Sequence, residues 1–162
     1  MRELLNSWLI PNDSRQPADE FAALAERRDW TGPEAAPVRE LRDDLRRIVE
    51  GDAPAGGLDD WIVRLDLRPS VTDGELSYRH RGGPAGDLLA AVVTAVGAGT
   101  WRRMKACPDC RWVFYDSTRN GSKRWCLMYA GGPDGRACGT IAKVRRYRDR
   151  QAAARSVSPD AG

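Results

Sequence analysis

Four cysteines within 32 residues constrain this chain more than any other feature of its sequence. They follow the spacing Cys107-x2-Cys110-x15-Cys126-x11-Cys138, and the first 106 residues contain no cysteine. A Cys-x-x-Cys pair places two thiolates on one tight turn, and two later cysteines can complete a tetrahedral shell around a metal ion. Four thiolates leave no open coordination position, so the spacing predicts one structural Zn²⁺ ion and not a catalytic one.

Two other uses of the cysteines stay open, a redox or disulfide pair and a set of unligated thiols. A redox Cys-x-x-Cys usually lies at a helix N-terminus in a βαβ unit, and the flanking sequence does not show that alternation. The first six residues contain no long apolar stretch with a cleavage site, so a cytoplasmic location is expected, where disulfides are rare. The single histidine, His80, lies far from the cysteines in sequence and is expected to be a surface or locally bonded residue.

The charge of +3 is distributed unevenly along the chain. Residues 1–100 contain 12 basic and 18 acidic residues, whereas residues 101–155 contain 14 basic and 4 acidic residues. This asymmetry indicates that the two parts have different roles, and it makes the basic part a candidate for binding a polyanion. The alternative is a basic surface that is only solvated or that packs on the acidic half. No apolar run reaches the roughly 20 residues that span a bilayer, so no membrane partner is expected.

The first 100 residues are predicted to form a mainly helical domain. The clearest helix follows a capping box at residues 31–34 and ends near Gly51, with apolar residues at spacings of three and four. Its apolar positions are Val38, Leu41, Leu45 and Ile48. A shorter apolar stripe lies at Phe21, Leu24 and Ala25, and a second short helix is expected over residues 58–65.

A change of hydrophobic period marks the rest of this domain. Residues 66–80 alternate on both sides of Asp73-Gly74, which predicts a small β-hairpin. Asp87 is expected to cap the next helix, which is almost wholly apolar from Leu88 to Val96 and is therefore expected to be buried.

Residues 101–155 are predicted to form a small zinc-finger module with four cysteine ligands that ends in a basic helix, followed by a flexible tail at 156–162. A strand is expected at 112–115, a turn at Asn120-Gly121 and a helix at 140–154. About 50 residues cannot build a large core, so the ion and a small aromatic cluster are expected to hold the module together. The aromatic residues are Trp101, Trp112, Phe114 and Trp125. The predicted fold class is thus α+β, mainly α.

The predicted helix at 140–154 separates basic from apolar residues. At 100° per residue, Ile141, Val144 and, more loosely, Tyr147 can turn inward, while basic side chains occupy the other faces. The preceding turn adds a second cationic patch, and the alternative is that Asp116 pairs structurally with one of the arginines. The candidate nucleic-acid contacts are Arg119, Asn120, Lys123, Arg124, Lys143, Arg145, Arg146 and Arg150.

Residues 101–150 resemble the CGNR zinc-finger family of bacterial proteins. The matching residues are Cys107-Pro-Asp-Cys110, Trp112, Phe114, Asp116, Arg119-Asn120, Arg124-Trp125-Cys126, Cys138-Gly139 and the basic run 142–150. In place of the Asn and Arg that name the family motif, this chain has Thr140 and Ile141, and residues 131–135 look inserted. The order of elements in residues 1–100 is similar to the ABATE-type domain that precedes the finger in this family. The resemblance implies a stress-induced transcription regulator whose finger binds DNA.

Three classes of function follow from these features. The first is a DNA-binding regulator whose N-terminal domain senses an unidentified ligand or forms a homodimer. The alternative is an adaptor that binds RNA or an acidic protein through the same basic surface. An enzyme is not expected, because the sequence has no second histidine, no Ser-His-Asp set and no phosphate-binding glycine loop. The one candidate site for catalysis is a pocket near Trp8, Trp30 and Trp61, although these tryptophans are better explained as core residues.

Overall fold

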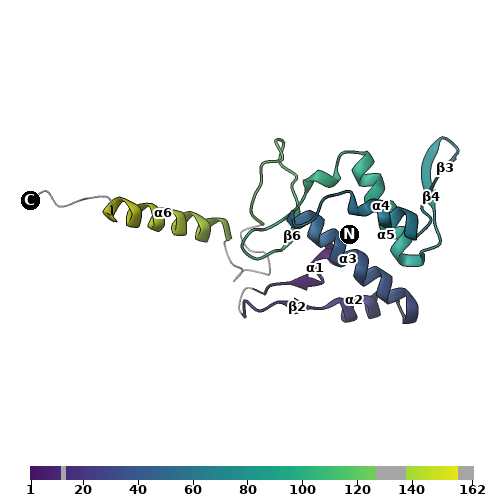
Figure 1. Cartoon of the computed structure of the whole chain (residues 1–162), viewed down its shortest axis with the longest axis horizontal. Helices are drawn as coiled ribbons and strands as arrows, with labels where there is room; N and C mark the ends of the chain where they lie inside the picture. Colours follow the sequence, from purple (N-terminus) through teal and green to yellow (C-terminus); the bar gives the residue numbers. More distant parts are fainter. Residues whose placement is uncertain (12–13, 127–137, 157–162) are drawn as a thin grey trace, which may run out of the picture.

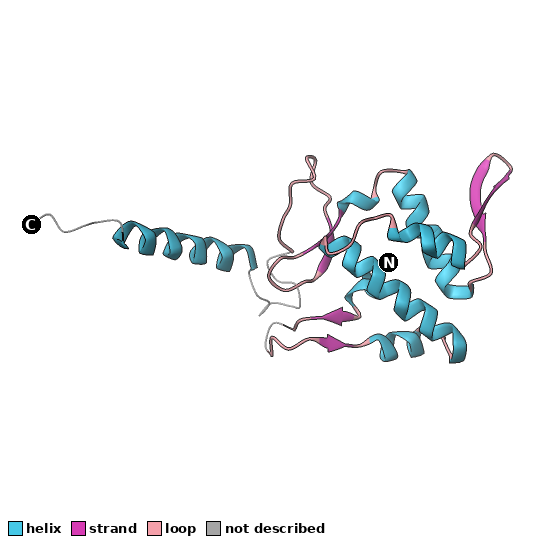
Figure 2. Cartoon of the chain, viewed as in Figure 1, coloured by secondary structure: helices cyan, strands magenta, loops and turns pink. Residues whose placement is uncertain are grey.

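A computed structural model describes residues 1–11, 14–126 and 138–156, and it consists of packed helices with three two-stranded antiparallel sheets among the described residues (Figure 1). Helices predominate over strands, as Figure 2 shows, so the expected α+β, mainly α class is confirmed. The last helix, α6 (Cys138–Ser156), extends from one end of the molecule, and the β3–β4 hairpin lies at the other end (Figure 1). None of the described helices is both long and apolar enough to cross a bilayer.

The chain begins with short elements that the sequence did not predict. Helix α1 (Arg2–Asn6) has only five residues, and strands β1 (Trp8–Leu9) and β2 (Ala18–Asp19) have two each. The strands pair antiparallel, with Trp8 opposite Asp19. Helix α2 (Phe21–Arg27) then forms over the predicted apolar stripe. Elements this short carry too few periods of a hydrophobic pattern to be recognised in sequence.

Helix α3 (Ala35–Glu50) is the central helix of the fold. Its predicted apolar positions Val38, Leu41 and Leu45 are fully buried, and Gly51 ends it in the left-handed conformation with φ 83°. The predicted capping box does not form. A 3₁₀ turn, η1 (Gly32–Glu34), separates Thr31 from α3, so the threonine lies too far from the free N–H groups of the helix to cap them.

Helix α4 (Gly57–Arg64) and the hairpin of β3 (Arg68–Thr72) and β4 (Glu75–Arg79) confirm the next two predictions. Asp73 and Gly74 both have positive φ, as a tight two-residue turn requires. Helix α5 (Gly83–Gly97) starts four residues before Asp87, so the predicted cap is wrong. A proline at the helix start sets its beginning, and Asp87 instead lies 3.1 Å from His80 Nε2.

Helix α5 is buried along one face and not all around. Ala85, Leu89 and Val92 are buried, whereas Val96 is exposed. The buried face contributes to a core that also includes Leu5, Leu41 and Leu45. The same core extends into the later part of the chain through Val113 of strand β6 (Val113–Tyr115), which pairs with β5 (Met104–Ala106) after the 3₁₀ turn η2 (Trp101–Arg103).

A buried ion pair links the first sheet to α3. The Arg42 side chain is almost fully buried, and its two Nη atoms lie 2.6 and 3.0 Å from the carboxylate oxygens of Asp19. The hydrogen bonds from Arg42 outweigh partial burial and hold the pKa of Asp19 well below its usual value. Arg42 also donates to Ser7 Oγ at 3.2 Å and lies over the Phe21 ring. This one side chain therefore connects the residue that ends α1 with β2, α2 and α3.

We expect Asp19→Asn to lower the free energy of unfolding by about 2 kcal/mol at neutral pH, because it leaves the buried guanidinium short of one partner. Because the folded-state pKa of Asp19 is depressed, its stabilisation is complete above an unfolded-state pKa of about 4 and is lost as the pH falls below it. The difference in free energy of unfolding between wild type and variant should therefore shrink on acidification. Denaturant unfolding at several pH values would measure this difference.

Asp43→Asn is the matched control. Asp43 contacts the same arginine at 2.7 Å, but its side chain is half exposed, so its loss should cost only about 0.5 kcal/mol. Equal stability of Asp19→Asn and wild type at neutral pH, or a gap that does not change with pH, would contradict this account of the ion pair.

Candidate metal centre

The four predicted cysteine ligands come together in one cluster. Their sulfur atoms all lie within 4.8 Å of one another, and all four side chains are buried. The Cys126 sulfur lies 3.6 Å from that of Cys110 and 3.8 Å from that of Cys138. A tetrahedral ion with Zn–S bonds of about 2.3 Å requires S···S separations of about 3.8 Å. A disulfide requires about 2.05 Å, so the disulfide alternative is wrong and the four thiols are free.

Three local structures position the four ligands. Cys107 and Cys110 flank a tight turn between β5 and β6, closed by hydrogen bonds from Arg111 N to Cys107 O and from Cys107 N to Trp112 O, both 2.9 Å. Arg111 has φ 60°, which lets the chain reverse immediately after the second cysteine. Cys126 follows the loop after β6. Cys138 is the first residue of α6, two residues earlier than the predicted start of that helix.

The electrostatics of the cluster favour a divalent cation. S–H donation from Cys110 and Cys126 lowers the pKa of the Cys107 thiol. The Cys107 sulfur in turn raises the pKa of the Cys110 and Cys126 thiols, and burial raises that of Cys138. Four buried thiolates bring negative charges together, and a cation is needed to balance them. Zn²⁺ supplies the positive charge and prefers sulfur ligands in tetrahedral geometry. The donor set therefore fits one zinc ion.

Three of the four predicted aromatic residues surround this cluster. Phe114 is buried with the cysteines, and Trp112 and Trp125 are partly buried against them. A Cβ on Gly139 would lie 3.4 Å from the Trp125 ring, so the first turn of α6 is in close contact with that indole. Trp101 instead packs against the core of the preceding helices. The prediction of a single aromatic cluster is therefore wrong for Trp101.

The loop after β6 is organised by Asp116, which is fully buried. Its carboxylate accepts hydrogen bonds from Lys105 Nζ at 2.7 Å, from Thr118 Oγ1 at 2.6 Å and from the backbone N–H of Thr118 and Lys123. Burial alone would raise the pKa of Asp116, but these four donors outweigh it and lower the pKa. The alternative that Asp116 pairs with an arginine is thus wrong. Lys105, on the neighbouring strand β5, takes that place and also donates to the carbonyls of Gly121 and Lys123.

A second network, which the sequence did not predict, holds the 107–112 turn against α3. Arg46 is buried, donates to the Arg111 carbonyl at 3.1 Å and pairs with Glu50. Glu50 also accepts from the Arg111 guanidinium at 2.7 Å. Two further bonds come from Asn6, whose amide donates to Val113 O at 2.9 Å and accepts from Val113 N at 2.8 Å. The only sequence signal is that Arg42 and Arg46 lie beside the apolar stripe of α3.

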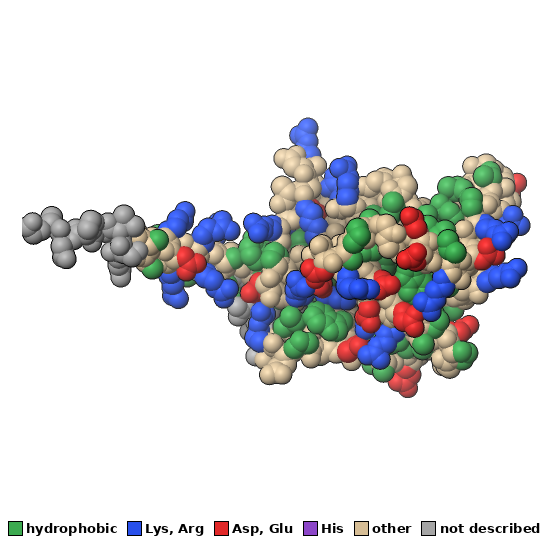
Figure 3. All heavy atoms as spheres, in the orientation of Figure 1, with side chains coloured by type: hydrophobic (Ala, Val, Ile, Leu, Met, Phe, Trp, Pro, Cys, Tyr) green, Lys and Arg blue, Asp and Glu red, His purple; other side chains and the backbone are tan. Residues whose placement is uncertain are grey.

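The eight candidate nucleic-acid residues occupy two surfaces. Arg119 and Asn120 are exposed in the loop, while Lys123 and Arg124 lie over the rings of Phe114 and Trp125 at 5.5 and 5.8 Å. The other four are exposed on α6, where Figure 3 shows basic side chains along the helix. These four are Lys143, Arg145, Arg146 and Arg150.

The inward-facing positions predicted for α6 are only partly present. Ile141 is half-buried, but Val144 is 44% exposed and Tyr147 is 58% exposed. The reason is visible in Figure 1, where α6 leaves the body of the protein after its first turns and so has no surface to cover these side chains. Residues 131–135 and the predicted tail after 156 lie outside the described residues.

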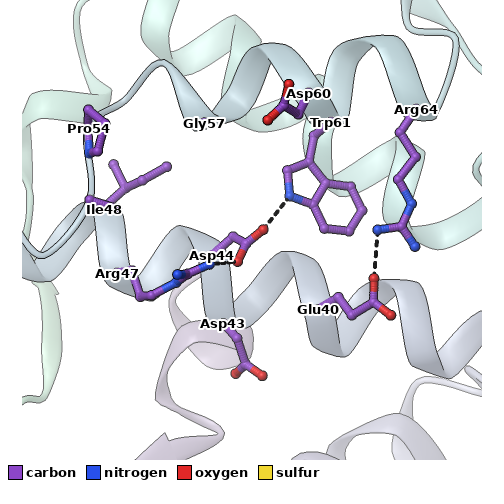
Figure 4. A pocket seen from close by; sticks show the side chains of 11 residues that line it. Glu40, Asp43, Asp44, Arg47, Ile48, Pro54, Gly57, Asp60, Trp61 and Arg64 are labelled. Carbon is purple, nitrogen blue, oxygen red and sulfur yellow. Dashed lines mark hydrogen bonds and ion pairs between the residues drawn. The ribbon is translucent and has the colours of Figure 1, made fainter.

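The three tryptophans that suggested a pocket do not share one. Trp61 lines a cavity of about 520 Å³ between α3 and α4, and its indole donates to Asp44 at 2.7 Å (Figure 4). Trp8 lies under the guanidinium of Arg46, and Trp30 stacks on Phe21. The cavity's other charged groups are largely paired, as in the Arg64–Glu40 contact of 2.6 Å.

Metal removal should selectively disorder the cysteine module. On chelation we expect the amides of Cys107 and Arg111 to lose hydrogen-exchange protection, because the turn that they close carries two of the four thiolates, which repel one another once the cation is removed. Amides within α3 and α5 serve as the internal control and should keep most of their protection. Readdition of one equivalent of Zn²⁺ should restore the lost protection, whereas protection that ignores the metal would contradict a zinc-organised module.

Comparison with known proteins agrees with this geometry for part of the chain. Residues 103–151 match the family model of the CGNR zinc finger. No curated protein matches the chain. The matched segment contains all four clustered cysteines, so residues 103–151 are similar to a CGNR zinc finger whose four sulfurs can bind one zinc ion.

Proposed function

We propose that this chain is a zinc-stabilised DNA-binding transcription regulator, which presents α6 and the loop at 116–124 to the phosphate backbone. One contrast in ion pairing supports the proposal. Nine arginines of residues 1–100 pair with carboxylates of that same part: Arg27, Arg28, Arg39, Arg42, Arg46, Arg47, Arg64, Arg68 and Arg81. The seven cationic candidates have no ion pair with any described carboxylate. Cations without an internal partner are free to neutralise phosphates.

The arrangement of α6 suits a long polyanion. Lys143, Arg146 and Arg150 recur at spacings of three and four, so they share one face of the helix. Their positive charge runs along an exposed helix whose start is held by the Cys138 ligand. A helix that is polar on nearly all sides gains little from packing on its own chain, which leaves it available for a partner. Contacts to phosphates would position the protein without specifying a base sequence.

The loop at 116–124 adds a second cationic surface with a fixed shape. Lys123 and Arg124 are oriented by the rings beneath them, and the Asp116 hydrogen bonds hold the backbone that carries Arg119 and Asn120. Arginine and asparagine side chains are the usual readers of guanine and adenine edges. We assign any sequence preference to these two residues and most of the affinity to α6.

Replacing Lys143, Arg146 and Arg150 together by Ala should weaken binding to duplex DNA. It should also make the negative slope of log binding constant against log salt concentration shallower by about 3, because three phosphate contacts no longer release counterions. Fluorescence anisotropy with a labelled random-sequence duplex at several salt concentrations measures both effects. The variant should keep the zinc content and melting curve of the wild type.

The matched control is the triple variant Arg39→Ala, Arg47→Ala and Arg64→Ala, which removes the same charge from residues that are already ion-paired. It should leave the salt slope unchanged. Absence of binding at low salt, or an equal effect of both triple variants, would refute the proposal. Preferential binding of single-stranded RNA or of an acidic protein in competition with duplex DNA would refute it as well.

A further inference from the structure

One face of the β3–β4 hairpin is apolar and largely uncovered. The register places Val71 opposite Leu76 and Pro69 opposite Tyr78, and side chains two residues apart on a strand share a face. Val71 is 71% exposed and Leu76 is 60% exposed, while Tyr78 packs partly against the core. The body of the protein therefore covers only the Tyr78 end of this face.

The two edges of the hairpin differ in their ability to accept another strand. A two-stranded sheet leaves both edges with unpaired backbone groups. Strand β3 contains Pro69, which has no N–H, so its edge lacks one donor. The turn at 73–74 has two residues, so its flanking pair, Thr72 and Glu75, is hydrogen-bonded. Hydrogen-bonded and non-hydrogen-bonded pairs then alternate, so Leu76 and Tyr78 lie in pairs that are not hydrogen-bonded to β3. Leu76 and Tyr78 of β4 therefore direct their backbone N–H and C=O groups outward.

The sequence of β4 is complementary to itself. It reads Glu75-Leu76-Ser77-Tyr78-Arg79. A twofold axis at Ser77 would pair two copies antiparallel, with Leu76 opposite Tyr78 and Glu75 opposite Arg79. In this register the outward backbone groups of Leu76 meet those of Tyr78 from the second copy, as a hydrogen-bonded antiparallel pair requires. The apolar pair lies on one face of the sheet and the charged pair on the other.

The charges of the single hairpin also favour this pairing. Arg79 lies opposite Arg68 in the β3–β4 register, and like charges in that position repel. Arg68 has a counter-charge in Asp66 at 2.7 Å, but Glu75 and Arg79 make no ion pair with any other described residue. Glu75 of a second copy would give Arg79 the counter-charge that its own chain does not provide.

We propose that the chain forms a symmetric homodimer in which β4 pairs with β4 of a second copy, giving a four-stranded antiparallel sheet in the order β3-β4-β4-β3. The contact is isologous, so each copy contributes the same Leu76–Tyr78 and Glu75–Arg79 pairs twice. The hairpin and α6 lie at opposite ends of the molecule (Figure 1), so the dimer leaves both basic helices accessible. The inference does not depend on DNA binding.

Sedimentation velocity of the purified, zinc-loaded chain over a range of concentrations tests the dimer in the absence of DNA. Leu76→Lys should weaken the dimer by at least about tenfold, because it replaces the apolar contact with Tyr78 across the twofold axis by an ammonium group that must lose hydration there. Val63→Lys is the matched control, since Val63 is an equally apolar residue that is 80% exposed on α4. That variant should leave the dimer unchanged.

Exchanging the charges of Glu75 and Arg79 distinguishes an effect on strand pairing between copies from an effect on folding. Glu75→Arg and Arg79→Glu should each weaken the dimer, because each places like charges opposite each other across the twofold axis, and the double variant should restore it. A monomer at all concentrations, or a dimer that these variants do not affect, would overturn the proposal. A hairpin that takes a strand from a different protein would leave the purified chain monomeric, which also overturns it.

Discussion

The repulsion among four buried thiolates is the constraint on which the second half of this protein depends. Their sulfur atoms lie within 4.8 Å of one another in a buried setting, where negative charge is costly. One Zn²⁺ ion relieves that repulsion and ties three separate segments together, the 107–112 turn, the end of the loop at Cys126 and the first turn of α6. The position of the basic helix is therefore a consequence of metal binding.

The metal module is attached to the helical part by polar contacts around a shared core. Arg46 reaches from α3 to the carbonyl of Arg111 beside the second zinc ligand, and Asn6 pairs with both backbone groups of Val113. Because Val113 is also part of the main core, the strand that leads away from the metal turn is held on both sides. Loss of order at the metal would therefore also remove contacts from the ends of α1 and α3.

Sequence patterns correctly predicted several features that depend mainly on residues close together in the chain. The cysteine spacing identified the ligands, the three-and-four spacing from Val38 to Leu45 identified α3, and Asp73-Gly74 identified the hairpin. Two local signals failed, the capping box at residues 31–34 and the cap at Asp87, and other errors concern contacts between distant residues. Asn6 and Val113 are 107 positions apart, and no periodicity signals such a pair. The exposure of Val144 and Tyr147 was also missed, because amphipathic spacing cannot reveal that a helix has no surface to pack against.

Zinc K-edge X-ray absorption on the purified protein measures the central claim most directly. The account predicts one zinc per chain, with a first shell of four sulfur atoms at about 2.3 Å and no nitrogen or oxygen scatterer. A shell with fewer than four sulfurs, or zinc-free protein whose cysteines are joined in disulfides, would contradict it.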